Sequence, residues 1–202
     1  AENLLAADPI NKFKGGTTSL TWTAISPSNN FEQSYSISSK VYYTYQTLSS
    51  AQLKIDNYES YFKTLPLADQ KTEKLGVISQ TNSLGPFLVS VTSQAQFSKD
   101  GSAPIEINIQ NTGGGKAFKN GDRPIATTID VISADVNGVD SCKNLPPKDL
   151  EIKLSSGSSA IVKCNLSVSG VSTTKIFPID ITLKYRYITE QESSVSVSSS
   201  VQ

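Results

Sequence analysis

The chain has 202 residues, with 18 basic and 18 acidic side chains and no formal net charge. Nucleic acids and anionic membranes are bound through a basic surface, so this balance argues against both as partners. Histidine is absent, which excludes the Ser-His-Asp and Cys-His catalytic arrangements and every histidine-ligated metal site.

The N-terminal residues 1–16, AENLLAADPINKFKGG, form an apolar extension that ends in a Gly-Gly hinge. We identify no partner strand for it within the chain. An exposed apolar strand is an aggregation hazard in a monomer, but it can complete the sheet of another subunit. The extension is therefore a candidate donor strand, and the alternative is an ordinary edge strand of the chain's own sheet. The candidate donor side chains are Leu4, Leu5, Ile10 and Phe13.

Alternation of apolar and polar residues predicts strands along most of the remaining chain. TSLTWTAI is expected to be a strand with Trp22 in the core. In FEQSYSISSKVYYTYQ, one face should be buried and Tyr42 should be exposed on the other. That buried face carries Phe31, Tyr35, Ile37, Val41, Tyr43 and Tyr45. Further strands are expected at AQLKID, LGVISQ, FLVSV, PIEINIQN, IATTIDVIS, LEIKL, AIVKCNLSV and IFPIDITLKYRY, with a possible helical turn at residues 58–70.

Turn sequences rich in Gly, Pro, Asn and Asp separate these strands at intervals of roughly ten residues, which is typical of a β-sandwich. We predict an all-β fold, an immunoglobulin-like or jelly-roll β-sandwich with extended terminal strands. It would form one large module with a shared core or, as we prefer, two small ones. The predicted segments are residues 1–16 (extension), 17–84 (first module), 85–190 (sandwich) and 191–202 (tail). LEIKL and AIVKCNLSV are expected to pair as a hairpin across SSGSS.

The two cysteines, Cys142 and Cys164, are too few for a thiolate zinc site and are not spaced as CxxC. A structural disulfide is expected, with a redox pair as the alternative. Alternation places Cys164 on the inward face of its strand. The absence of methionine, even at position 1, suggests that Ala1 is a processed end, left by removal of a signal peptide or of an initiator or tag. We therefore expect an extracellular or cell-surface location, with no membrane span in the mature chain.

Other chemistry-bearing patterns are weak. TGGGK (112–116) lacks the GK[ST] ending of a phosphate loop and is expected to be a tight turn. Turn aspartates at positions 100, 122, 135 and 140 could ligate calcium but lack the DxDxDG spacing. We predict no catalytic residue, no metal and no cofactor. Asn165 lies in the sequon Asn-Leu-Ser on the outward face, so it is a candidate glycosylation site.

The C-terminal SSVSVSSSVQ keeps a period-two pattern beyond the last predicted strand, and the edge of a partner could order it. The pattern SKVYYTYQTLSSAQLKI, GPFLVSV, PIEINIQNTGGGKAF and ITLKYRYITEQESSVSV resembles secreted archaeal cell-surface proteins with immunoglobulin-like domains of the CARDB type. Such proteins include thread and pilus subunits that assemble by donor-strand complementation. The resemblance implies a structural role and carries over no catalytic residue.

From these observations we expect a non-enzymatic structural subunit of an extracellular filament or pilus, polymerising by β-strand donation. Its partner would be further copies of itself, with other cell-surface proteins as possible additional partners. The alternative is a monomeric surface adhesin or ligand-binding module that uses loops such as residues 111–122. A hydrolase based on paired carboxylates is the weakest hypothesis.

Overall fold

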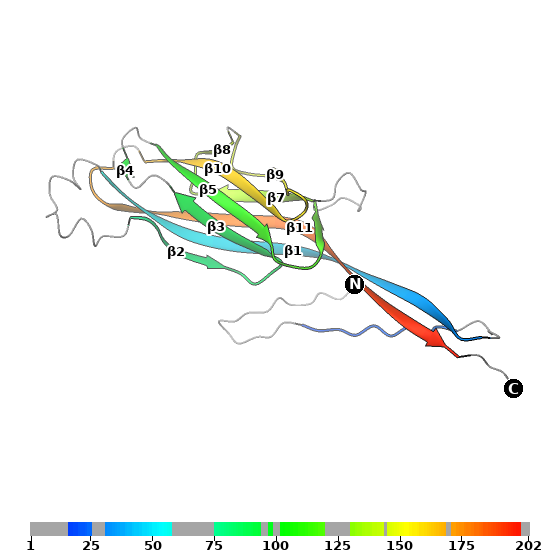
Figure 1. Cartoon of the computed structure of the whole chain (residues 1–202). Coiled ribbons are helices and arrows are strands. Elements are labelled where there is room, and N and C mark those ends of the chain that lie inside the picture. The colour runs from blue at the N-terminus through cyan, green and yellow to red at the C-terminus, as the bar shows by residue number, and fades with distance from the viewer. Residues whose placement is uncertain are drawn as a thin grey trace. The chain divides into compact units, whose positions relative to one another are not determined.

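The computed structural model describes residues 16–25, 31–57, 75–93, 97–98, 102–119, 130–143, 145–168 and 171–198 (Figure 1). Throughout these residues the chain is all-β, with strands in two sheets and a single parallel pair, β1 with β4. The candidate donor residues Leu4, Leu5, Ile10 and Phe13 lie outside the described residues, as does the predicted helical turn at 58–70.

The larger sheet has the order β2-β1-β11-β7-β9, and two short strands extend it: β4 beside β1 and β6 beside β11. Its strands are β1 (Gln33–Asn57), β2 (Gly76–Asn82), β4 (Phe97–Ser98), β6 (Lys116–Phe118), β7 (Val131–Asn137), β9 (Leu150–Lys153) and β11 (Lys175–Val197). The second sheet has the order β3-β5-β10-β8. It consists of β3 (Phe87–Ser93), β5 (Ser102–Asn111), β8 (Ser141–Cys142) and β10 (Ser159–Ser167).

The core consists of the inward side chains of both sheets, and the predicted alternation is confirmed along five strands. Every second residue is buried in β3, β5 and β9, in β10 from Val162 onward and in β11 from Ile179 to Tyr187, because successive side chains of a strand point to opposite faces. These buried residues include Val89, Val91, Ile105, Ile107, Ile109, Leu150, Ile152, Val162, Cys164, Leu166, Ile179, Ile181, Leu183, Tyr185 and Tyr187.

By its contacts the chain divides into two compact units. The core unit, Tyr43–Tyr187, contains every residue of the buried core cluster. The second unit comprises Ala1–Tyr42 and Ile188–Gln202, so β1 and β11 each contribute residues to both units. Strands from both predicted modules, 17–84 and 85–190, share the larger sheet: β1 and β2 come from the first, and β7, β9 and β11 from the second.

The predicted hairpin of LEIKL and AIVKCNLSV is wrong. β9 pairs with β7 in the larger sheet, whereas β10 pairs with β5 and β8 in the second sheet. Only an isolated bridge between Ser155 and Ser159 joins the two strands. The turn at Ser156 and Gly157, both with positive φ, therefore carries the chain from one sheet to the other.

The prediction that Trp22 lies in the core is also wrong. Residues 16–25 are exposed and form no strand, and Trp22 is 75% exposed. Phe31, Ile37 and Val41, expected on a buried face, are exposed as well, whereas Tyr43 and Tyr45 pack against the core. The alternation is present at all these positions, but only those in the core unit have an opposing sheet to cover them. Tyr42 is exposed, as predicted.

Candidate functional site

Residues 16–25, GTTSLTWTAI, are the most incompletely packed part of the described chain, and we call them the Trp22 segment. Leu20 is 70% exposed, Trp22 75% and Ile25 93%. Leu20, Trp22 and Ala24 follow a strand's period of two, and threonines stand between them. Threonine, tryptophan and isoleucine favour strands, and the segment carries no charge. It therefore has the composition of a strand but pairs with none of the described strands.

β1 and β11 are neighbours in the larger sheet, and in the second unit their residues 33–42 and 188–197 form what we call the ribbon (Figure 1). The Ser38 hydroxyl donates to the Glu190 carboxylate at 2.9 Å, and the Ser39 hydroxyl donates to the Gln191 carbonyl at 3.3 Å. Lys40 Nζ lies 2.9 Å from the same Glu190 carboxylate, and that hydrogen bond raises the pKa of Lys40.

The C-terminal valine-serine repeat belongs to β11 as far as Val197, so its period-two pattern is that of a strand in the chain's own sheet. One side of the ribbon remains uncovered. Ile37 is 48% exposed, Val41 54% and Val195 44%, although all three share the alternation whose other members form the core. Among the described strands, only β11 pairs with β1 over residues 36–42, which leaves the other edge of β1 open there.

The edge of the second sheet at β3 is closed in a different way. The Gln80 side-chain amide donates to the Val89 carbonyl at 2.6 Å and accepts from the Val91 N–H at 3.0 Å. Asn82 donates to the same Val89 carbonyl at 3.0 Å and accepts from the Val89 N–H at 3.3 Å. These two side chains of β2 occupy the hydrogen-bonding positions of a further strand, so this edge of β3 is protected from strand addition.

The glycine-rich turn after β5 is held by Asn111 and Tyr187 and is the tight turn that the sequence predicts. The Asn111 amide donates to the carbonyls of Gly115 and Gly157 at 3.0 and 3.1 Å. The Tyr187 hydroxyl donates to Asn111 Oδ1 at 2.7 Å and accepts from the Gly115 N–H at 3.0 Å. A Cβ at Gly113 would lie 2.5 Å from that hydroxyl, so only glycine fits there.

Tyr185 and Thr47 form a buried polar pair, with their hydroxyl oxygens 2.6 Å apart. Burial raises the pKa of Tyr185. Phe87 meets the Tyr185 ring edge-to-face, with centroids 4.7 Å apart. Tyr43 and Tyr45 pack against the same cluster, which supports the interpretation of these tyrosines as packing residues.

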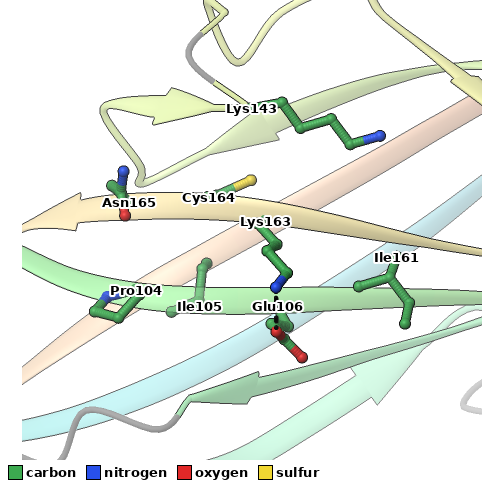
Figure 2. Close-up of a pocket in the computed structure, with 8 residues that line it drawn as sticks. All are labelled: Pro104, Ile105, Glu106, Lys143, Ile161, Lys163, Cys164 and Asn165. Carbon is green, nitrogen blue, oxygen red and sulfur yellow. Dashed lines mark ion pairs between the residues drawn. The ribbon is translucent and has the colours of Figure 1, made fainter.

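A hollow of about 660 Å³ lies on the outer face of β5 and β10 (Figure 2). Glu106 and Lys163 stand opposite each other on the two strands, 3.3 Å apart between Oε1 and Nζ. Lys143, Ile161 and Asn165 also line it. Asn165 is exposed, as predicted for a glycan acceptor, although its backbone pairs with both Pro104 and Ser141.

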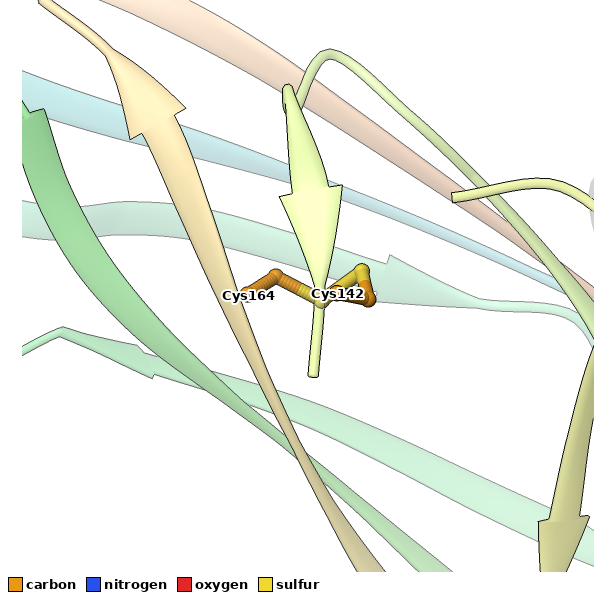
Figure 3. Close-up of a disulfide and its surroundings, with 2 residues drawn as sticks. All are labelled: Cys142 and Cys164. Atoms are coloured by element: carbon orange, nitrogen blue, oxygen red, sulfur yellow. A yellow bond between two sulfur atoms is a disulfide. The ribbon is translucent and has the colours of Figure 1, made fainter. Parts of the chain in front are cut away.

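The predicted disulfide is confirmed: Cys142 and Cys164 are bonded, directly opposite each other on β8 and β10 (Figure 3). Both cysteines are buried. The bond anchors the two-residue strand β8 to a central strand of the same sheet. β8 is too short to be stable by pairing alone, so the disulfide fixes its position.

Of the four aspartates predicted to lie in turns, Asp100 and Asp122 lie outside the described residues. The prediction is wrong for Asp135, which belongs to strand β7. Asp135 accepts from the Asp149 N–H at 2.9 Å and pairs with Lys184, and these contacts lower its pKa. Nowhere in the described part of the chain do three or more metal-ligating side chains cluster. Within that part, no helix has the length and apolar character to span a membrane.

Sequence reasoning missed the role of Gln80 and Asn82. Their spacing of two residues places both amides on one face of β2, and this is the only local signal that the sequence offers. Comparisons with protein-family models, curated protein sequences and solved structures give no match for this chain. The features of the described chain that bear on function are the Trp22 segment, the uncovered ribbon and the sealed edge of β3.

Proposed function

We propose that the chain is a structural subunit of an extracellular filament or pilus and that its subunits polymerise by donating β-strands to one another. The observation that carries the proposal is the Trp22 segment, which has a strand's alternation, no charge and no partner among the described strands. An extended peptide added to a sheet edge gains main-chain hydrogen bonds and buries alternate side chains. The chain thus supplies both requirements of strand donation, an unpaired segment and an open edge.

The energy available from this segment is substantial. A tryptophan buries roughly 150–250 Å², so covering a side chain that is 75% exposed removes on the order of 150 Å² from water. At about 25 cal/mol per Å² this stabilises the complex by roughly 4 kcal/mol. Large aromatic anchors of this kind dominate many protein interfaces.

The proposal includes an extracellular location and an immunoglobulin-like or jelly-roll arrangement of the sandwich. The Cys142–Cys164 disulfide supports the location, because such bonds persist in oxidising compartments. The two packed sheets support the arrangement. In antibody domains the disulfide links the two sheets, whereas here it joins neighbouring strands of one sheet. Membership among archaeal CARDB-type surface proteins remains part of the proposal, which assigns no catalysis to the chain.

The test compares the full chain with a variant that lacks residues 1–25. The variant should keep its fold, because the buried core cluster and the disulfide lie between residues 43 and 187. Negative-stain electron microscopy and size-exclusion chromatography should show filaments for the full chain and a monomer for the variant. Filaments from the truncated chain, or a full chain that stays monomeric at high concentration, would contradict the proposal.

The hollow on β5 and β10 favours a second candidate, a monomeric adhesin. Its lysines and Glu106 could hydrogen-bond a polar ligand such as a sugar, with Ile161 as an apolar contact. Charge reversal at Lys163 would then abolish adhesion to cells, and both the original chain and the variant would be monomers. Adhesion retained in that variant, or filaments formed by the original chain, would argue against this candidate.

A further inference from the structure

We propose that the Trp22 segment of one copy adds as a strand to the open edge of β1, at residues 36–42, in a second copy of the chain. This inference rests on the proposed function and names its donor and acceptor within the described chain. It places the anchoring side chains at Leu20 and Trp22 rather than at Leu4, Leu5, Ile10 and Phe13.

The donor side is defined by alternation and charge. Leu20, Trp22 and Ala24 form one side of the segment, and Thr21 and Thr23 lie on the other. Leu20 and Trp22 remain 70% and 75% exposed, so they are available to another surface. The absence of charge matters, because a charged side chain packed against the apolar face of the ribbon would have to be partly desolvated.

The acceptor side offers an open edge and an uncovered apolar face together. Over residues 36–42, β1 pairs only with β11 among the described strands. Ile37 and Val41 are about half exposed on one face of this stretch. Lys40, the one charged residue of the stretch, is paired with Glu190, so an uncharged donor meets a locally neutral edge. The added strand would place Leu20 and Trp22 over Ile37 and Val41.

Two competing arrangements are less favourable. The outer edge of β3 is already occupied by the amides of Gln80 and Asn82. A hairpin within one copy is suggested by the turn sequence SPSNN at 26–30, yet the Trp22 segment forms no ladder with its own β1. We therefore assign this edge to the Trp22 segment of a second copy. An isolated two-stranded ribbon is marginally stable in water, and a third strand would stabilise it.

Cysteine cross-linking in the full chain tests the contact directly. The two native cysteines are bonded to each other and buried, so introduced thiols report cleanly. Thr21→Cys or Thr23→Cys in one preparation is mixed with Ser36→Cys or Ser38→Cys in another, then assembled and oxidised. If Leu20 and Trp22 lie on the same face as Ile37 and Val41, alternation places the two threonines on the opposite face, which also carries Ser36 and Ser38. We expect a disulfide-linked dimer from the mixture and none with Ser90→Cys, which lies on the sealed strand β3.

A second experiment measures assembly of the Trp22→Ser variant, with Thr23→Ser as its matched control. We expect Trp22→Ser to raise the protein concentration needed for filaments by at least about tenfold, while the control assembles normally. Circular dichroism should be unchanged in both, because neither residue belongs to the core cluster.

The outcomes separate this inference from the proposed function. If filaments form without these cross-links, and form equally well with Trp22→Ser, the inference is overturned. The donor strand would then lie within residues 1–14, and the proposed function would still hold. The Thr21→Cys/Ser38→Cys double variant is oxidised at high dilution to detect a contact within one copy. If the cross-link forms only within single copies, the Trp22 segment pairs with its own β1 as a hairpin, and the inference is overturned. Linkage to Ser90→Cys would move the acceptor to β3. A full chain that forms no filaments would refute both.

Discussion

The amide cap on β3 leads to a quantitative prediction about Gln80 and Asn82. The Val89 carbonyl accepts from both side chains, at 2.6 and 3.0 Å, whereas the Val91 N–H depends on Gln80 alone. Because the carbonyl is shared, either amide can satisfy it when the other is removed. The two substitutions to alanine should therefore not be additive.

The expected magnitudes follow from this arrangement. Asn82→Ala removes one of the two hydrogen bonds to the Val89 carbonyl and the 3.3 Å hydrogen bond from the Val89 N–H. This should lower the free energy of unfolding by about 1 kcal/mol. Gln80→Ala leaves the Val91 N–H without its partner and should cost about 1–2 kcal/mol. The double variant leaves the Val89 carbonyl, the Val89 N–H and the Val91 N–H without their side-chain partners. Its loss of unfolding free energy should therefore exceed the sum of the two single losses by roughly 1 kcal/mol.

The free energy of unfolding is measured by urea titration followed by circular dichroism, with Thr81→Ala as the control on the same strand. The control should change it by less than about 0.5 kcal/mol. Size-exclusion chromatography of the double variant should also show association, because an uncapped edge can pair with another chain. If the double variant costs only the sum of the single variants, or all three resemble the control, the cap reasoning is refuted.

Four further predictions concern the core unit. Tyr185→Phe leaves the Thr47 hydroxyl buried without its partner and should cost about 1–2 kcal/mol in urea unfolding, and adding Thr47→Val should recover most of this loss. Gly113→Ala should cost about 1–3 kcal/mol, because its Cβ would meet Tyr187 and Pro86, whereas Gly114→Ala has open space and should be neutral within about 0.5 kcal/mol. Replacing Cys142 and Cys164 by serine removes a link across 22 residues and should cost about 3 kcal/mol, measured against the oxidised chain. The lowered pKa of Asp135 means that its carboxylate stabilises the fold above about pH 4 and that this stabilisation is lost as the pH falls through the lowered value. Asp135→Asn should therefore flatten the acid side of the stability profile, and an unchanged profile would contradict this.

Much of the fold could be predicted from the sequence because alternation is a local property. Ile105, Ile107 and Ile109 are inward simply because every second residue of a strand shares a face. The same rule placed Cys164 inward and Asn165 outward. Turn residues separated the strands, and two cysteines in a charge-poor chain indicated one structural disulfide. These inferences needed no knowledge of which strand lies beside which.

The partners of each strand depended on tertiary structure. Val41 and Leu53 belong to one strand and one alternation, yet Val41 is 54% exposed and Leu53 is buried, because an opposing sheet covers only the second. β9 and β10 looked like a hairpin, but pairing with distant strands placed them in different sheets.

The cap on β3 likewise exists only where two sheet edges meet. The spacing of apolar side chains thus predicts most of the strands, the inward faces of those in the core unit and the all-β class. Long-range packing decides which faces are buried, which strand edges are capped and which segment lacks a partner among the described strands. The reason is that the residues that bury a side chain or pair with a strand lie far away in the chain.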